Sequence, residues 1–220
     1  MRSLVLFLAV AAFPVACLGQ SLGPDTYFSS TAAALQALML LPQPPAPGTA
    51  AQAANVQILN TVMNTATPQM VAQAQADAVP SVFDFSTVLG ADFTARNLPA
   101  TNSFFQKVTI NTQNANDTLK NIYNSQGPVS AASYPSSHAL LGLVDGVLLG
   151  EMLPEKKGPL VTFGVQYGLN RLILGQHWPT DVSAAQMETG IFLQDLFASP
   201  QFQIDFNQAR AELRAQQGLR

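Results

Sequence analysis

Residues 139–153 read ALLGLVDGVLLGEML, residues 160–174 read LVTFGVQYGLNRLIL, and residues 181–197 read DVSAAQMETGIFLQDLF. In each stretch the apolar residues recur at the spacing of a helix, and none shows the alternation of a strand. Charged residues interrupt all three stretches, so none of them has the composition of a membrane span. These residues are Asp145, Glu151, Arg171, Glu188 and Asp195. We therefore predict that the C-terminal half is a set of packed helices.

Helical patterns also account for the rest of the chain. Residues 32–41 are strong helix formers that end at the proline-rich segment 42–48, and residues 50–79 form two helices divided at Thr67-Pro68. The phenylalanines of residues 82–105 are predicted to lie in the core. Asn116-Asp117 is interpreted as a cap within residues 111–123, and Ser199-Pro200 as the start of a last helix. The predicted fold class is all-α, a single-domain helical bundle.

The N-terminus has the pattern of a segment that is removed. Arg2 is followed by an uncharged, apolar stretch, which is typical of a signal peptide over residues 1–19. The competing interpretation is lipoprotein processing at Cys17, which Pro14 opposes. We therefore expect a periplasmic or secreted protein whose single domain spans residues 20–220. Cys17 is the only cysteine, so cleavage after Gly19 would leave a mature chain without disulfides.

Composition restricts the partners of the chain. Only 10% of the residues are charged, the net charge is −3, and no basic cluster occurs. The sequence therefore predicts no nucleic-acid-binding surface, and any anion site has to be local. The apolar runs predict no membrane span. The oligomeric state stays open, a homo-oligomer included.

Both histidines of the chain lie in short polar segments beside the apolar stretches. The first segment, residues 134–138, reads YPSSH and directly precedes a predicted helix. Free backbone N–H groups at the start of a helix, with the hydroxyls of Ser136 and Ser137, can hold phosphate oxygens. The alternative is that one serine only caps the helix and that His138 is a surface residue.

The second segment begins with Asn170-Arg171 and continues to residues 177–181, which read HWPTD. His177 and Asp181 are four positions apart, so they can meet across one helical turn, and Pro179 is acceptable in a first turn. The carboxylate would then fix one ring nitrogen and leave the other free to attack. Arg171 reaches the same point only if the chain bends, and Gly175 offers such a bend.

In these residues the chain resembles the bacterial class A non-specific acid phosphatases, within the superfamily of phosphatidic-acid phosphatases and vanadium haloperoxidases. The signature of that family is Lys-x6-Arg-Pro, then Pro-Ser-Gly-His, then Ser-Arg-x5-His-x3-Asp. Further similarity lies in residues 40–45, 73–77 and 200–213. The resemblance implies a phosphoric monoester hydrolase without a cofactor or metal, acting on small phosphomonoesters through a phosphohistidine intermediate.

The resemblance also implies the role of each site residue. His177 would be the nucleophile, Asp181 its orienting partner, and His138 the acid that protonates the leaving alkoxide. The phosphate oxygens would be held by Lys120, Ser136, Ser137 and Arg171.

Three positions depart from the family pattern. The second family arginine falls on Gly127, the family glycine is Ser137, and the serine before Arg171 is Asn170. The first departure matters most, because glycine provides neither the charge nor the paired donors of a guanidinium. Loss of such a contact costs about 1.5–3 kcal/mol, or roughly tenfold to over a hundredfold in rate.

Three alternatives to an active phosphatase therefore remain: a phosphate-binding, nearly inactive relative, a vanadate-dependent haloperoxidase, and an unrelated helical scaffold. Zinc bound by His138, His177 and Asp181 is a further option. It is disfavoured because no other histidine or cysteine completes a zinc site.

Overall fold

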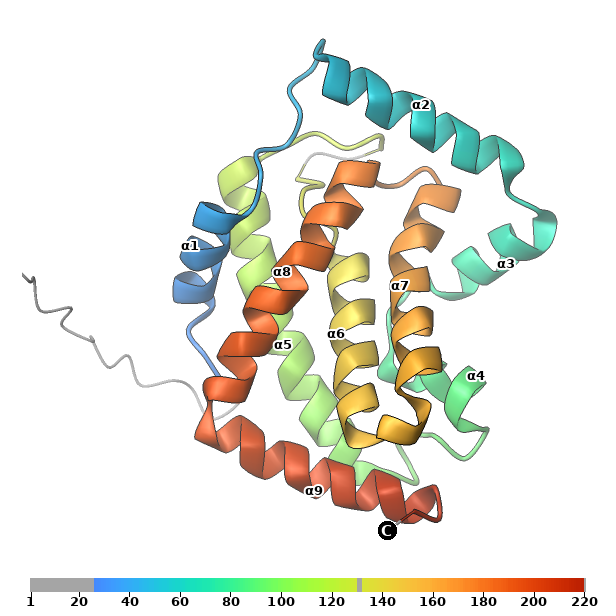
Figure 1. Ribbon diagram of the computed structural model, residues 1–220, viewed down its shortest axis with the longest axis vertical. Helices are drawn as coiled ribbons and strands as arrows, with labels where there is room; N and C mark the ends of the chain where they lie inside the picture. The colour runs from blue at the N-terminus through green and yellow to red at the C-terminus, as the bar shows by residue number, and fades with distance from the viewer. Residues whose placement is uncertain (1–25, 130–131, 220) are drawn as a thin grey trace, which may run out of the picture.

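The computed structural model describes residues 26–129 and 132–219 (Figure 1). The predicted signal peptide and Cys17 lie outside this part of the chain. Within it the protein is built from helices and contains no strand, which confirms the all-α prediction. The elements are α1 (Ser30–Leu40), α2 (Ala50–Thr65), α3 (Pro68–Ala76), η1 (Val82–Phe85), α4 (Ser86–Leu89), α5 (Pro99–Tyr123), α6 (Ser137–Met152), η2 (Pro154–Lys156), α7 (Lys157–Ile173), α8 (Pro179–Ala198) and α9 (Pro200–Gln216).

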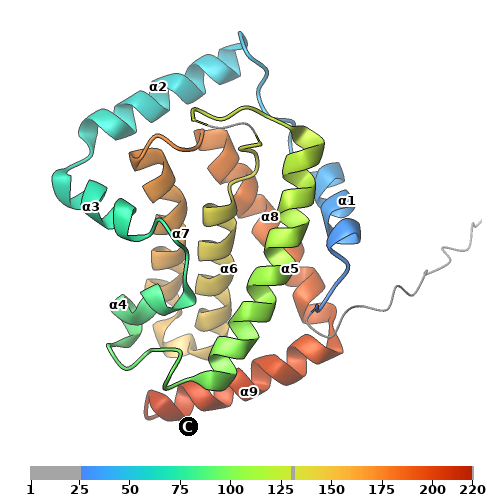
Figure 2. The same ribbon diagram turned by 180° about the vertical axis from the view of Figure 1, so that it is seen from behind.

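Helix α6 forms the centre of the bundle. It is apolar on nearly all sides, as expected of a helix that neighbours surround. Helices α5, α7 and α8 run beside it, and α9 crosses one end of the bundle (Figures 1 and 2). None of the described helices is both long enough and apolar enough to cross a membrane.

Helices α6 and α7 approach each other through glycine. A β-carbon on Gly142 of α6 would lie 2.7 Å from the carbonyl oxygen of Gly164 and 2.8 Å from Cγ of Tyr167, both on α7. Such distances leave no room for a side chain, so the two backbones lie in direct contact. This contact fixes the spacing between the start of α6 and the end of α7.

The helix boundaries follow the capping residues of the sequence. Thr67 and Ser199 each accept a hydrogen bond from a backbone N–H of the helix that follows, and a proline occupies the first position of both helices. The predicted breaks at these two places are confirmed. The phenylalanines expected in the core are buried there, with Phe83 only partly covered.

One predicted boundary was wrong. Helix α5 runs without interruption from Pro99 to Tyr123, so Asn116-Asp117 caps nothing. The side chain of Asn116 is fully buried instead and takes part in tertiary hydrogen bonds. An asparagine in the middle of a helix resembles a cap in sequence, because both uses depend on the same short amide.

Candidate active site

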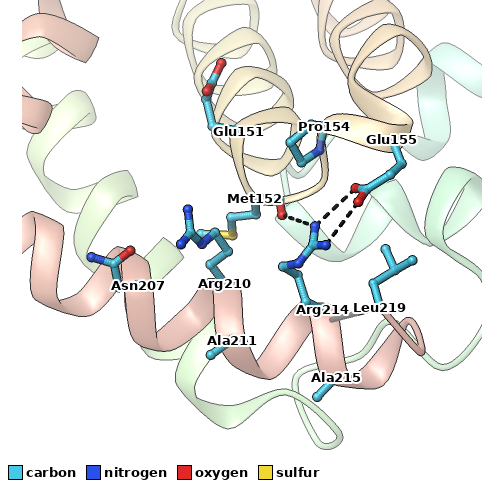
Figure 3. A pocket seen from close by; sticks show the side chains of 10 residues that line it. All are labelled: Glu151, Met152, Pro154, Glu155, Asn207, Arg210, Ala211, Arg214, Ala215 and Leu219. Atoms are coloured by element: carbon cyan, nitrogen blue, oxygen red, sulfur yellow. Dashed lines mark hydrogen bonds and ion pairs between the residues drawn. The ribbon is translucent and has the colours of Figure 1, made fainter.

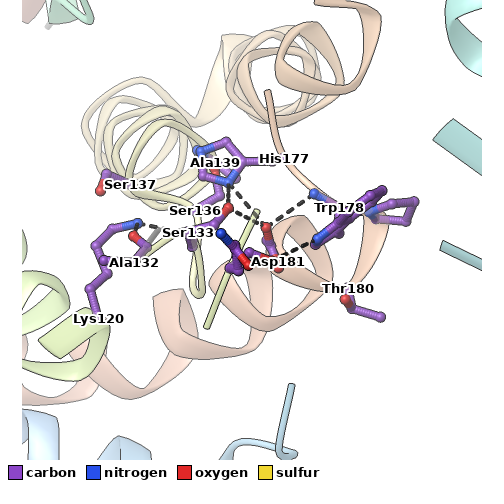
Figure 4. Close-up of polar contacts among 12 residues, drawn as sticks. Lys120, Ala132, Ser133, Ser136, Ser137, Ala139, His177, Trp178, Thr180 and Asp181 are labelled. Carbon is purple, nitrogen blue, oxygen red and sulfur yellow. Dashed lines mark hydrogen bonds and ion pairs between the residues drawn. The ribbon is translucent and has the colours of Figure 1, made fainter. Parts of the chain in front are cut away.

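The two histidine segments meet at the end of the bundle opposite α9 (Figures 1 and 4). Helix α7 ends at Ile173, and Gly175 then adopts a φ of 66°, a left-handed conformation that glycine takes readily. The chain turns there, so that His177 follows the turn and α8 begins at Pro179. The bend expected at Gly175 is present.

His177 lies just outside α8, yet its ring meets Asp181 of the first turn (Figure 4). Its Nδ1 is 3.2 Å from Oδ2 of Asp181 and 2.9 Å from Oγ of Ser133. The Ser133 hydroxyl donates to the same carboxylate oxygen at 2.6 Å. Because a carboxylate only accepts, Nδ1 carries the hydrogen, and the lone pair of Nε2 is left unengaged.

The carboxylate of Asp181 is held from several directions. Its Oδ2 also accepts from the backbone N–H of Trp178 at 3.0 Å, and its backbone oxygen accepts from the N–H of Ser136. The Asp181 side chain is 1% exposed and that of His177 14%. The imidazole is therefore held in one orientation with only its outer edge open to solvent.

The first turn of α6 supplies the second group of donors. Ser136 is the N-cap, and its Oγ accepts from the backbone N–H of Ala139 at 3.4 Å. The backbone N–H groups of Ser137 and His138 are at the helix start, where no carbonyl of the same helix is available to them. Such groups attract anions, because the positive end of the helix dipole lies there.

His138 is partly buried beside this turn. Its Nε2 lies 3.1 Å from the carbonyl oxygen of Ala78, so Nε2 carries a hydrogen and Nδ1 is the nitrogen that gains or loses a proton. Burial, with a smaller contribution from the positive charges of Arg171 and Lys120, lowers the pKa of His138 to about 4. These charges therefore act on the ring of His138 over the distance that separates them.

Lys120 comes from the last turn of α5. Its ammonium group donates to the carbonyl oxygens of Ala132 at 3.1 Å and Ser133 at 3.0 Å. Two of its three hydrogens are thus used to hold the segment that carries Ser133, and one stays available to a ligand. Burial lowers the pKa of Lys120, an effect that the charges of Asp181, Glu188 and Asp117 oppose.

Arg171 is 1% exposed and anchored by its terminal nitrogens. It donates to Oε1 of Gln176 at 3.1 Å and to the carbonyl oxygen of Ala74 at 2.7 Å. Its Nε is buried and has no partner among the described residues. Asn170, which replaces the family serine, donates instead to the buried Asp77. Two residues of the segment 73–77 thus accept hydrogen bonds from Arg171 and from its neighbour Asn170.

The loop between α5 and α6 passes beside the histidine segment. The indole N–H of Trp178 donates to the carbonyl oxygen of Gln126 at 3.0 Å, which holds the loop one residue away from Gly127. Gly127 therefore follows a residue that is held against Trp178, and it brings no side chain.

Sequence reasoning missed three of the polar groups gathered here: Ser133, Asn116 and Glu188. Ser133 precedes the YPSSH segment, and its position immediately before a recognised motif was the only available signal. Asn116 was interpreted as a cap, and Glu188 only as a charge within an apolar run. Hydrogen bonds now join Glu188 to Asn116 and Asn116 to Ser137.

A cavity of about 650 Å³ opens at the opposite end of the bundle, between the end of α6, η2 and α9 (Figure 3). Its polar side chains include an ion pair between Arg214 and Glu155, and no histidine lines it. It offers a volume for a ligand but neither of the two histidines.

These features define a class of protein: an all-α bundle with an oriented histidine among cationic and helix-terminal donors suited to phosphate. No family model matches the chain. It is similar to a non-specific acid phosphatase of Providencia stuartii (26% identical over 86% of this chain and 85% of the relative). It is also similar to a non-specific acid phosphatase of Salmonella typhimurium (28% identical; 67% and 68%) and to an acid phosphatase of Zymomonas mobilis (24% identical; 80% and 75%). These similarities support an acid phosphatase family and a phosphatase function.

Proposed function

We propose that the chain is an acid phosphatase that hydrolyses phosphomonoesters through a phosphohistidine at His177. The observation that carries this proposal is the hydrogen bonding of the His177 ring. Asp181 and Ser133 both engage Nδ1, so that in the neutral ring Nε2 keeps its lone pair. Export to the periplasm or the medium belongs to the proposal as well and rests on residues 1–19.

The reaction has two displacements. Nε2 of His177 attacks phosphorus, the bond from phosphorus to the ester oxygen breaks, and His138 gives its proton to the departing alkoxide. Water then attacks the phosphohistidine while His138 accepts a proton, and inorganic phosphate leaves. Lys120, Arg171 and the N–H groups of Ser137 and His138 would neutralise the phosphoryl oxygens throughout.

The pKa of His138 fits this cycle when a ligand is present. In the empty site it is near 4, because burial and the positive charges of Arg171 and Lys120 oppose protonation. A bound phosphate group brings negative charge to the same place, which favours the protonated ring. We therefore expect His138 to become an acid only after the substrate has bound.

The test is turnover of residues 20–220 on a panel of phenyl and alkyl phosphomonoesters, comparing the parent with His177→Ala. We expect no turnover in the variant and unchanged helical circular dichroism. A phosphorus-labelled ester, quenched in alkali, should label the parent and the control variant His138→Ala but not His177→Ala. Undiminished turnover in His177→Ala would contradict the mechanism.

Gly127 favours one second candidate, a phosphate-binding and nearly inactive relative. Without the family guanidinium the site has a smaller positive charge for the transition state. A parent chain that binds inorganic phosphate but turns over no ester would support this candidate. Halide oxidation on addition of vanadate would instead identify a haloperoxidase.

A further inference from the structure

Glu188 is a buried carboxyl group that the proposed reaction does not use. It lies on α8 seven residues after Asp181, two turns along the same face, and its exposure is 0%. Its Oε2 accepts a hydrogen bond from Nδ2 of Asn116 at 3.0 Å, whereas its Oε1 has no partner among the described residues. A buried carboxylate with one hydrogen bond is costly, so the neutral acid is the favoured form.

A line of hydrogen bonds leads from Glu188 to the phosphate-facing turn of α6. Oδ1 of Asn116 accepts from the Ser137 hydroxyl at 2.8 Å, while the amide nitrogen of the same asparagine donates to Glu188. Glu188 thereby fixes which end of the amide faces Ser137. Because the Ser137 hydroxyl hydrogen points to Asn116, this residue offers the site its backbone N–H, as a glycine would.

Few charges face Glu188. Helices α1 and α2, which pack against α8, carry no titratable side chain, and α9 packs against its far end. The titratable groups of the other neighbours are Lys107, Asp117, Lys120 and Tyr123 of α5, Tyr134 of the segment before α6, His138, Asp145 and Glu151 of α6, Lys157, Tyr167 and Arg171 of α7, and Asp181 and Asp195 of α8 itself. The charge of Glu188 acts on the pKa values of Lys120, Tyr123 and Tyr134. An ionised Glu188 would therefore be felt at the phosphate-binding lysine.

We propose that Glu188 is a positioning residue whose protonation controls phosphate binding. In its neutral form it orients Asn116 and Ser137 and leaves the positive charge of the site undiminished. In its ionised form it adds a negative charge beside Lys120. This inference rests on the proposed phosphate site.

The expected direction follows from the carboxyl group. Burial raises the pKa of Glu188 to about 8, although the Asn116 hydrogen bond and the charge of Lys120 act against this rise. The group is therefore neutral in acid and at neutral pH and ionises as the pH rises past 8. Phosphate affinity should fall over the same range.

The experiment measures the dissociation constant of inorganic phosphate by calorimetry from pH 5 to pH 9 on the full mature chain. Glu188→Gln keeps an acceptor for Asn116 and has no charge. We expect its affinity to lie within about twofold of the parent at pH 6 and to exceed the parent about fivefold at pH 9. Phosphate and Lys120 titrate in both proteins, so the ratio of the two constants isolates Glu188.

Two further variants sharpen the result. Glu188→Met is neutral but accepts no strong hydrogen bond, so we expect about threefold to tenfold weaker binding than the parent at pH 6. Asp145→Asn neutralises another buried carboxyl, one that acts on the pKa of neither Lys120 nor His138. Its curve should follow the parent. Circular dichroism and thermal melts check that each variant is folded.

Parallel curves for the parent and Glu188→Gln would overturn the role of the charge, and Glu188→Met matching the parent at pH 6 would overturn the orienting role. If Glu188→Gln fails to fold, the curve of Glu188→Met decides the first point alone, because it too lacks the charge. A parent that binds phosphate without turnover removes the proposed hydrolysis and leaves this test intact. A parent that binds no phosphate at pH 6 overturns both.

Discussion

The two sides of the proposed phosphate site differ in how closely they match the signature of the acid phosphatases that the chain resembles. On the α7 and α8 side, Arg171, His177 and Asp181 stand at the family spacing, and the carboxylate of Asp181 has several donors. On the α5 and α6 side, Gly127 and Ser137 depart from the pattern, and a buried acid supports the serine through Asn116. The side proposed to form the covalent bond thus matches the signature, while the side proposed to bind the phosphate charge departs from it.

The largest effect should come from the orienting carboxylate. Asp181→Asn removes the charge that favours a hydrogen on Nδ1, so the wrong tautomer becomes accessible and turnover should fall by about 10²–10⁴-fold. Ser133→Ala keeps the carboxylate and should lose only about tenfold. Steady-state kcat/KM on one phenyl ester measures both. Equal losses would mean that the serine and the aspartate act as one unit.

His138→Ala tests whether the two sides act together, because this residue lies on α6 and the proposed reaction pairs it with His177 of the other segment. We expect an alkyl ester to lose about 10²–10⁴-fold and a phenyl ester much less, since a basic alkoxide depends most on protonation. The measurement is kcat/KM for the two ester types in the parent and the variant. Similar losses for both would argue against the acid role.

The pH profile gives a companion measurement for the same residue. The acid must be protonated, so activity falls as the pH rises through the pKa of His138. That pKa is near 4 in the empty site and should be higher once phosphate is bound. The alkaline limb of kcat should therefore lie at higher pH than that of kcat/KM. Coincident limbs would contradict a substrate-raised pKa.

Gly127→Arg should bring the α5 and α6 side closer to the family signature. If the loop follows the family path, the new guanidinium faces the phosphate, and kcat/KM should rise by about tenfold to a hundredfold. Gly127→Lys is the matched control, because it adds charge without the two-pronged donor. A folded Gly127→Arg chain with unchanged or lower activity would show that the loop has been rebuilt.

The smallest effect on activity is expected from a substitution in the glycine contact between α6 and α7. Gly142→Ala forces a methyl group against Gly164 and Tyr167 and should reduce the free energy of unfolding by about 1–3 kcal/mol. Gly190→Ala is the control, because a β-carbon there meets nothing within 4 Å and removes backbone freedom from the unfolded chain. Denaturant unfolding should show opposite signs for the two variants, and equal signs would contradict the packing argument.

The sequence predicted the helical class and most helix boundaries, because apolar periodicity and the Thr67-Pro68 and Ser199-Pro200 pairs are local signals. It predicted the contact of His177 with Asp181 through their spacing, although His177 lies before the helix and not within it. Asn116 and Glu188 were beyond such reasoning. Their pairing joins positions 72 residues apart, and no local pattern encodes it.

The glycine contact between α6 and α7 affects which substitutions this part of the protein can accept during evolution. Backbone against backbone has no rotamers, so the spacing between the two helices does not depend on which side-chain conformations the core adopts. The starting end of α6 and the end of α7 that carries Arg171 thus keep one separation while surrounding residues are replaced. Substitutions at Gly127 would leave this separation unchanged, whereas Ser133 of the same loop contacts the ring of His177 directly.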